Sequence, residues 1–278
     1  MNFNIQPINF NIANVRFKSN SNISQPKGSD LERNPKMDSF EMSIGYVNDA
    51  HGQTNNMMRI LSGIKGDLKL SAGDNDIGDE KNDAIHQATT KFLNIADIKA
   101  SALGNHEIDM SQKDCIDAIN RFNGLMLSIN FEQNPLEEQD PEDIQKYGRA
   151  DLKNHLTKSA VVEVKGQKIG LIGASPIDMM SRLTHPNYYT DCSVDDLDDT
   201  IELIQNEIDK FKEQNINKVI LVSHLGHKAD KFVAENIDGI DVIVGGHTHE
   251  LIKDIKEGEN LLYSKTGEPI IMTEAGRD

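Results

Sequence analysis

The 278-residue sequence predicts an α/β fold in which helices pack on sheets. From Phe40 onward, short apolar runs that suit strands alternate with longer segments whose apolar residues recur at helical spacing. The β-branched runs Val219–Val222 and Val242–Val244 are typical of buried strands. Polar clusters come directly after the strand-like runs, which is where open α/β sheets bind their ligands. These observations place the chemistry at the carboxyl ends of the strands.

Three strand–helix pairs are predicted in the first half of the chain. The strands are Met42–Val47, Leu68–Ala72 and Ala100–Leu103. The helices are Thr54–Ile64, Glu80–Ile95 and Lys113–Phe122. In the second helix, four apolar residues share one face, which we expect to be buried. They are Ile85, Ala88, Phe92 and Ile95. His86 lies in the middle of this helix and is expected to face solvent.

The second half of the chain continues the alternation. Two runs flank Gly166 in the manner of a β-hairpin, Ala160–Val164 and Lys168–Ile172. Asp195–Phe211 is expected to be a long helix, because its acidic first turn suits the positive end of the helix dipole. The later strands are Val219–Val222, Val242–Val244 and Ile270–Met272. The acidic, irregular segment Phe131–His155 is expected to be a surface loop with a helical turn.

Residues 1–40 differ from the rest, being rich in Asn and Ser and containing NFNI twice. We expect a flexible N-terminal tail, followed by one domain over residues 41–278. The alternative is a short β-arm, indicated by the alternating residues Phe3, Ile5, Phe10 and Ile12. The tail lacks the apolar core of a signal peptide, so export is not indicated.

The charge balance restricts the partners. The chain has 29 basic and 45 acidic residues, for a net charge of −16. A surface this acidic repels nucleic-acid phosphates, so we expect no nucleic-acid partner. No apolar run approaches the roughly 20 residues of a membrane-spanning helix. Cys115 and Cys192 are too few for a disulfide framework and fit either a reducing compartment or no redox role at all. The compartment stays open, with a small preference for the cytoplasm, and the oligomeric state cannot be inferred.

Five polar clusters follow predicted strands. They are Asn48–Gly52, Gly73–Gly78, Gly104–Asp109, Ser223–Gly226 and Gly245–His249. Each cluster alone has a plain structural interpretation, and a single histidine such as His224 is more often structural than catalytic. Together they offer carboxylate, amide and imidazole donors, which suit divalent ions such as Mn, Fe, Zn or Co. Seven candidate ligands exceed the four of a tetrahedral zinc and suit two ions that share a carboxylate.

These clusters resemble the motifs of the calcineurin-like metallophosphoesterases, and within that superfamily the catalytic domain of the 5′-nucleotidases. The matching stretches are NDAHG, GDNDIG, GNHEID, SHLG and GGHTH, in the family order. The hairpin VEVKGQKIGLIG is similar to the segment between the third and fourth motifs of that branch. The resemblance covers roughly Ser43–Arg277. It implies a four-layer α/β/β/α sandwich and a dimetal-dependent phosphoester hydrolase.

The resemblance also implies a ligand set for two divalent ions, which could be Mn, Zn, Fe, Co or Mg. One ion would be bound by Asp49, His51 and His249. The other would be bound by Asn105, His224 and His247. Asp74 would bridge the two ions and offset part of their repulsion. A water between them would become a hydroxide nucleophile near neutral pH.

His106 is implied as the catalytic residue that does not bind metal, with a role at the transition state and the leaving group. Asp109 lies three residues later and could hold the imidazole in its protonated form. The alternative for Asp109 is an acid at a helix N-terminus. Glu107 is expected to support the site from behind. Asp76 departs from the family pattern, which often has an apolar or aromatic residue there.

The implied activity is that of a 5′-nucleotidase-like phosphomonoesterase acting on a small phosphorylated substrate, with a nucleotide favoured. The alternatives are a cyclic-nucleotide phosphodiesterase, a nucleotide-sugar pyrophosphatase and a non-catalytic phosphate-binding remnant. The family's last strand or strands, and its second domain that stacks the nucleobase, are expected to fall outside this sequence. Either the sequence is truncated, or it is a single-domain enzyme with another specificity. The reaction class is therefore better supported than the substrate.

Overall fold

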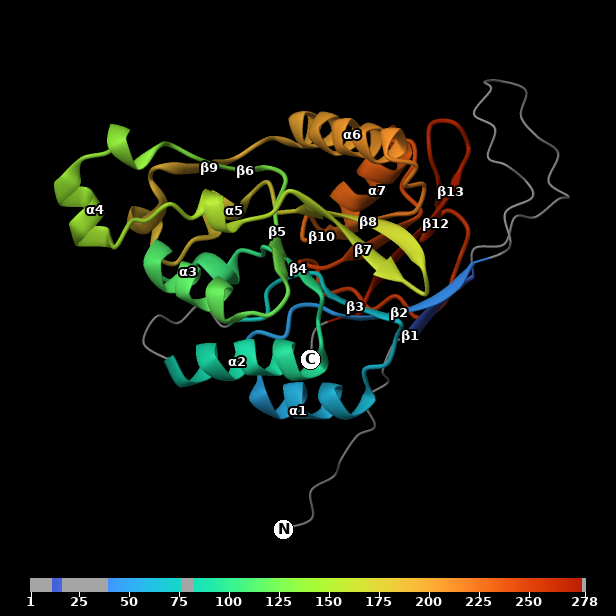
Figure 1. The fold of residues 1–278 in the computed structure, drawn as a ribbon, viewed down its shortest axis with the longest axis horizontal. Coiled ribbons are helices and arrows are strands. Elements are labelled where there is room, and N and C mark those ends of the chain that lie inside the picture. The colour runs from blue at the N-terminus through green and yellow to red at the C-terminus, as the bar shows by residue number, and fades with distance from the viewer. Residues whose placement is uncertain (1–11, 17–39, 77–82, 277–278) are drawn as a thin grey trace, which may run out of the picture.

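The computed structural model describes residues 12–16, 40–76 and 83–276 (Figure 1). One sheet has five strands in the order β1-β2-β3-β4-β5. Their bounds are β1 Ile12–Arg16, β2 Glu41–Val47, β3 Leu68–Ser71, β4 Ala100–Ala102 and β5 Leu125–Leu127. Strands β2 to β5 pair in parallel, and β1 pairs with β2 in the antiparallel sense. This sheet holds the three strands predicted in the first half of the chain.

The second sheet has six strands in the order β12-β13-β11-β10-β8-β7. Their bounds are β7 Ser159–Val164, β8 Gln167–Ala174, β10 Val219–Ser223, β11 Val242–Gly245, β12 Leu261–Tyr263 and β13 Pro269–Glu274. The four central strands β8, β10, β11 and β13 are parallel. The outer strands β7 and β12 pair with their neighbours in the antiparallel sense. The predicted hairpin about Gly166 is confirmed as β7 and β8.

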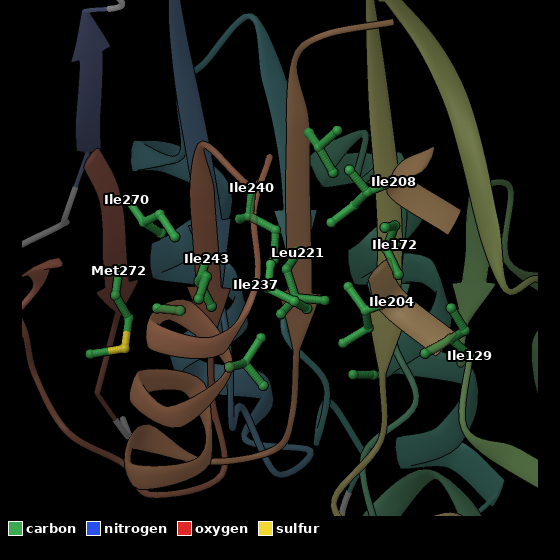
Figure 2. Packing of buried hydrophobic residues seen from close by; sticks show 14 of the residues in the cluster. Ile129, Ile172, Ile204, Ile208, Leu221, Ile237, Ile240, Ile243, Ile270 and Met272 are labelled. Atoms are coloured by element: carbon green, nitrogen blue, oxygen red, sulfur yellow. The ribbon is translucent and has the colours of Figure 1, made fainter. Parts of the chain in front are cut away.

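Helices cover the outer face of each sheet, which completes the predicted four-layer α/β/β/α sandwich (Figure 1). The helices on the first sheet are α1 Thr54–Gly63, α2 Asp83–Ala96 and α3 Gln112–Arg121. Those on the second sheet are α6 Leu197–Glu213 and α7 His227–Asn236. Figure 2 shows Ile204 and Ile208 of α6 beside Ile172 of β8. Between the sheets, Leu70 of the first lies in one buried cluster with Val222 of the second.

The two sheets approach each other closely at Gly173 of β8. A Cβ atom at this position would lie 2.1 Å from the Cβ of Leu127 on β5. Real Cβ atoms do not approach this closely, so glycine is required there. This close approach holds strand ends of the two sheets near one another, where the polar clusters lie.

The prediction of the buried face of helix α2 is wrong in part. Ile95 of α2 is 71% exposed, whereas His86, expected to face solvent, is only 5% exposed. The buried side of α2 is rotated toward Leu93 and Ala96. His86 can be buried because its Nδ1 lies 2.6 Å from Oδ1 of Asp76, the residue that departs from the family pattern. A buried polar group with such a partner avoids most of its desolvation penalty.

The segment Phe131–His155 contains more structure than a loop with one helical turn. Its helices are α4 Pro141–Tyr147 and the 3-10 turns η2 Leu136–Glu138 and η3 Lys153–His155. It also contains β6 Phe131–Gln133, which pairs with β9 Cys192–Val194 in a small antiparallel sheet. The sequence did not predict this pairing, because two three-residue strands about 60 residues apart have no periodic signal.

The structure describes only part of the N-terminal region for which a tail or a β-arm is predicted. Within residues 1–40, Ile12–Arg16 form β1, so the flexible tail does not hold for these five residues. Residues 1–11 and 17–39 lie outside the described residues, and so do Phe3, Ile5 and Phe10 of the alternative β-arm. Among the helices described over residues 40–76 and 83–276, none is long and apolar enough to cross a membrane.

Candidate metal centre

The candidate site lies where the loops after β2, β3, β4, β10 and β11 meet. Eight described non-glycine residues have positive φ, and five of them are predicted metal ligands. These five are Asp49 (φ 51°), His51 (φ 45°), Asp74 (φ 51°), His247 (φ 76°) and His249 (φ 59°). Left-handed backbone is costly for such residues and concentrates at functional sites. The loops therefore accept backbone strain to point these side chains at one another.

Asp49, His51 and His249 form the first group of potential ligands. Oδ1 of Asp49 lies 3.2 Å from Nε2 of His249 and 3.7 Å from Nε2 of His51. The two imidazole Nε2 atoms are 3.2 Å apart. Donors that bind one ion at about 2.0–2.2 Å are separated by about 3–3.6 Å, so this spacing fits a common ion. These three residues match the first predicted ligand set.

Asp74, His224 and His247 form the second group. Nε2 of His224 lies 3.1 Å from Oδ2 of Asp74. Nδ1 of His224 donates a hydrogen bond to the carbonyl oxygen of Ala72 at 2.5 Å, which fixes the ring and leaves Nε2 to face the group. Asn105, the fourth predicted ligand here, is 5% exposed.

Asp74 lies between the two groups. Its Oδ1 accepts a hydrogen bond from the backbone N–H of His106 at 2.9 Å, while its Oδ2 faces His224. It also belongs to a third potential ligand group, with His51 and His106. A carboxylate that reaches both clusters has the position that a bridge requires. Six of the seven predicted ligands thus belong to these groups, and Asn105 directly precedes His106 of the third group. Their roles as ligands are still a prediction.

The unpaired atoms of the site test whether it fits metal ions. Within the described part of the chain, three buried atoms here make no hydrogen bond: Oδ1 of Asp49, Oδ1 of Asn105 and Nε2 of His224. Oδ1 of Asp49 and Nε2 of His224 each have an ion-pair neighbour, at 3.2 and 3.1 Å, so the cost of about 1–3 kcal/mol for an unpartnered buried atom applies to Oδ1 of Asn105. All three carry, or can carry, a lone pair suited to a divalent ion of the Mn, Fe, Zn or Co type. The donor set therefore fits divalent ions.

The buried carboxylates and imidazoles of the site shift one another's pKa values. Burial would raise the pKa of Asp74, but the charge of His224 and of His106 lowers it below its usual range. Burial likewise opposes the protonated form of His224, yet the carboxylates of Asp74 and Asp49 raise its pKa to about 10. For His247, burial and the neighbouring His224 lower the pKa to about 4. The two buried carboxylates thus attract a cation into the site, and a proton on His224 neutralises part of their charge.

His106 and Asp109 form a close pair. Nδ1 of His106 lies 2.7 Å from Oδ2 of Asp109, which is 1% exposed. His106 begins the 3-10 turn η1 His106–Ile108, in which residues three apart are eclipsed. The hydrogen bond to Asp109 raises the pKa of His106 against the effect of burial. Asp109 does not cap α3, because Ser111 holds that position. This geometry favours the predicted pair over the helix-terminal alternative.

Glu107 supports the site from behind. Its buried carboxylate accepts hydrogen bonds from the backbone N–H groups of Gly104, Asp74 and Asn75, at 2.9, 2.9 and 2.7 Å. It therefore connects the loop after β3 to the loop after β4. Gly104 makes this possible, because a Cβ there would lie 2.2 Å from Oδ1 of Asp74. The sequence indicated a supporting role for Glu107, and the structure shows its contacts.

Two further supporting residues were missed by sequence reasoning. Asn48 donates from Nδ2 to Oδ2 of Asp49 at 2.5 Å and accepts from the backbone N–H of Ala275 at 2.7 Å. Glu274 accepts from Oγ1 of Thr248 and from the backbone N–H of Glu250, so it holds the loop of the two histidines after β11. Burial raises the pKa of Glu274 to about 8. Asn48 could have been noticed from its place beside Asp49, whereas Glu274 has no local signal.

Comparison with known proteins agrees with this architecture. The family model of the calcineurin-like phosphoesterases matches residues 42–251. A probable 5′-nucleotidase of Treponema pallidum (strain Nichols) is 26% identical over 272 residues, covering 85% of this chain and 43% of that protein. The 5′-nucleotidase precursor of Thermus thermophilus has a TM-score of 0.65 at 22% identity, covering 84% of this chain and 48% of its own.

The NAD nucleotidase of Haemophilus influenzae gives the same TM-score of 0.65 and 22% identity, covering 84% of this chain and 45% of its own. At this level of identity the solved structures show a shared fold. The chain spans less than half the length of these relatives.

Proposed function

Because this chain belongs to the calcineurin-like phosphoesterase family, we propose that it is a 5′-nucleotidase-like phosphomonoesterase that uses two divalent ions. The observation that carries this proposal is the pair of potential ligand groups connected by Asp74. Relatives named as 5′-nucleotidases support a nucleotide as the substrate. The buried, unpaired donor atoms of the site support its occupation by metal.

Seven side chains would hold the ions. Asp49, His51 and His249 would hold one ion; Asn105, His224 and His247 would hold the other; Asp74 would contact both. When bound, the ions would neutralise phosphoryl charge and make an attacking water more acidic. The protein fixes the donors in advance through the backbone contacts of Glu107 and the hydrogen bond from His224 to Ala72. Such fixed donors need little rearrangement during the reaction.

His106 would act on the substrate directly. Oδ2 of Asp109 accepts a hydrogen bond from the Nδ1–H group of His106, so Nε2 of His106 is the nitrogen available to the substrate. The hydrogen bond to Asp109 raises the pKa of His106 and so favours its imidazolium form. A protonated Nε2 can donate to a phosphoryl oxygen or deliver its proton to the leaving oxygen. Asp109 acts through His106 and is a positioning residue.

A substrate panel separates this function from the alternatives. The full chain is stripped of metal, titrated with Mn²⁺ and assayed with p-nitrophenyl phosphate, AMP, a cyclic nucleotide and a nucleotide sugar. Mn-dependent hydrolysis of AMP supports the nucleotidase. Faster hydrolysis of the cyclic nucleotide or the nucleotide sugar would assign another member of the same chemistry. Two bound metals without any turnover would favour a phosphate-binding protein, and a folded chain that binds no metal would contradict the proposal.

A further inference from the structure

A short segment beside the metal centre connects its two functional parts. The four-residue helix α5 is Met179–Arg182, and Asp178 precedes it. Oδ1 of Asp178 lies 3.4 Å from Nε2 of His247, a proposed metal ligand. A few residues later, the backbone N–H of Thr184 donates to Oδ1 of Asp109 at 2.8 Å. Residues 178–184 therefore run from the metal ligands to the catalytic pair.

This segment is held by a buried side chain as well as by the contacts at its two ends. Met179 is 0% exposed and packs in a buried cluster with Leu103 and Ile108, which belong to the loop after β4. The segment is thus attached to the same loop that carries His106. A side chain on its exposed side has a fixed position relative to the centre.

Arg182 is the cation on this exposed side. Its Nε donates to Oδ2 of Asp178 at 2.6 Å, while the other oxygen of that carboxylate faces His247. One carboxylate therefore separates the guanidinium from a proposed metal ligand. The contact with Asp178 uses Nε, and the side chain is 51% exposed, so its Nη donors are accessible to a ligand.

The charge distribution of the chain favours a role for Arg182 in binding an anionic substrate. The chain carries a net charge of −16, and the site itself contains several carboxylates, which together repel a phosphorylated substrate. Arg182 is attached through Asp178 to the edge of the site, because the same carboxylate contacts both the guanidinium and His247. A guanidinium also has the fork geometry that matches two oxygens of one phosphoryl group.

We propose that Arg182 binds a second phosphoryl group of the substrate, adjacent to the one that the metal centre cleaves. The inference rests on the proposed function, because the two ions are assigned to the phosphoryl group that reacts. In the free protein Asp178 holds the guanidinium, and the substrate replaces this carboxylate. The substrates therefore include nucleotides with two or more linked phosphoryl groups, in addition to the monophosphates of the proposed function.

The test compares Arg182→Gln with a matched control, Lys210→Gln. Lys210 lies on α6, is 63% exposed and pairs with Glu207, so its loss removes one charge without touching the site. The Mn-loaded full chain is assayed for kcat/KM with ADP and with AMP. Arg182→Gln should lower the ADP-to-AMP ratio by about 10- to 100-fold, chiefly through KM for ADP. Arg182→Lys should restore part of this ratio, and Lys210→Gln should leave it unchanged.

Binding provides a second readout that does not need turnover. Methylenediphosphonate and methylphosphonate are titrated into the Mn-loaded protein by calorimetry. The wild type should prefer the diphosphonate, and Arg182→Gln should lose about tenfold of that preference. An unchanged substrate ratio together with an unchanged diphosphonate preference would overturn the role of Arg182.

The two proposals fail in different ways. Hydrolysis of AMP and ADP that is insensitive to Arg182, together with an unchanged diphosphonate preference, would remove only the further inference. A protein that binds Mn²⁺ and shows the Arg182-dependent diphosphonate preference, yet hydrolyses neither nucleotide, would retain the anion site and contradict the nucleotidase.

Discussion

The two sheets contribute to the metal centre in different ways. The five-stranded sheet brings both buried aspartates, Asp49 and Asp74, and its loops are tied together by backbone hydrogen bonds to Glu107. The six-stranded sheet brings three histidines after β10 and β11: His224, His247 and His249. These are attached across the sheet interface, for example through the hydrogen bond from His224 to Ala72.

The first sheet therefore supplies the negative charge of the centre, and the second sheet supplies most of its imidazoles. The first sheet fixes the negative charge that attracts a cation, and Glu107 ties two of its loops together. The second sheet supplies imidazoles that bind metal only when neutral, and their positions depend on how the two sheets pack. Substitutions in the two regions should therefore have different signatures.

The largest effect is expected from Asp74→Asn. Because Asp74 reaches both ligand groups, its loss should lower the occupancy of both ions and reduce kcat by more than the roughly 10²–10⁴-fold of a lost acid–base group. The matched variant Asp49→Asn touches one group and should lower the occupancy of one ion. Metal content per chain by elemental analysis, with the fold checked by circular dichroism, distinguishes them. Loss of a single ion in Asp74→Asn would contradict the bridge.

His106→Ala should separate catalysis from metal binding within the first sheet. The variant should keep its metals and lose about 10²–10⁴ in kcat. In Asp109→Asn, the pKa of His106 should fall, because its hydrogen bond to a carboxylate is what raises it. Activity that needs protonated His106 declines as pH rises through this pKa, so the declining limb should move to lower pH. A pH–rate profile measures this shift. A metal-loaded His106→Ala enzyme with near wild-type rate would rule out the role.

The second sheet should respond to pH through His224. Without metal, its pKa is raised to about 10, so His224 is protonated at pH 7. A metal that binds Nε2 must displace this proton, while Nδ1 keeps its hydrogen bond to Ala72. Metal affinity should therefore rise about tenfold per pH unit between pH 6 and 8.

Calorimetry in two buffers of different ionisation enthalpy counts the released protons. The wild type should release about one proton more than His224→Asn does. Equal proton release by both proteins would show that His224 is neutral before the metal binds.

The sequence predicts the parts of this comparison that have local signals. Strand-like runs followed by Asp, Asn and His place the seven candidate ligands at one edge of the sheets, because parallel strands share their carboxyl ends. The spacing of His106 and Asp109 likewise predicts a pair, which the 3-10 turn η1 forms. The assignment of each ligand to an ion came from the family resemblance and is still a prediction.

Contacts between distant segments could not be predicted in this way. Glu274 holds the loop of His247 and His249 only because β13 pairs with β11, and no residue beside Glu274 indicates this. Burial of His86 depends on Asp76, which lies ten residues earlier in the chain. Helical periodicity alone assigned a polar residue to solvent, since it contains no information on such a partner.

The smallest effect is expected at this Asp76–His86 pair, which lies behind the first sheet's ligands. His86→Ala removes the imidazole from a carboxylate that is 7% exposed, and should lower the free energy of unfolding by about 3 kcal/mol. Lys91→Ala, at an exposed position of the same helix, serves as the control and should change stability by less than about 0.5 kcal/mol. Urea unfolding of the metal-free proteins measures both. Because Asp76 is not a proposed ligand, the metal content of folded His86→Ala should equal that of the wild type. Equal stability of the two variants would mean that the pair merely tolerates burial, and that the first sheet's loops are held by Glu107 without help from α2.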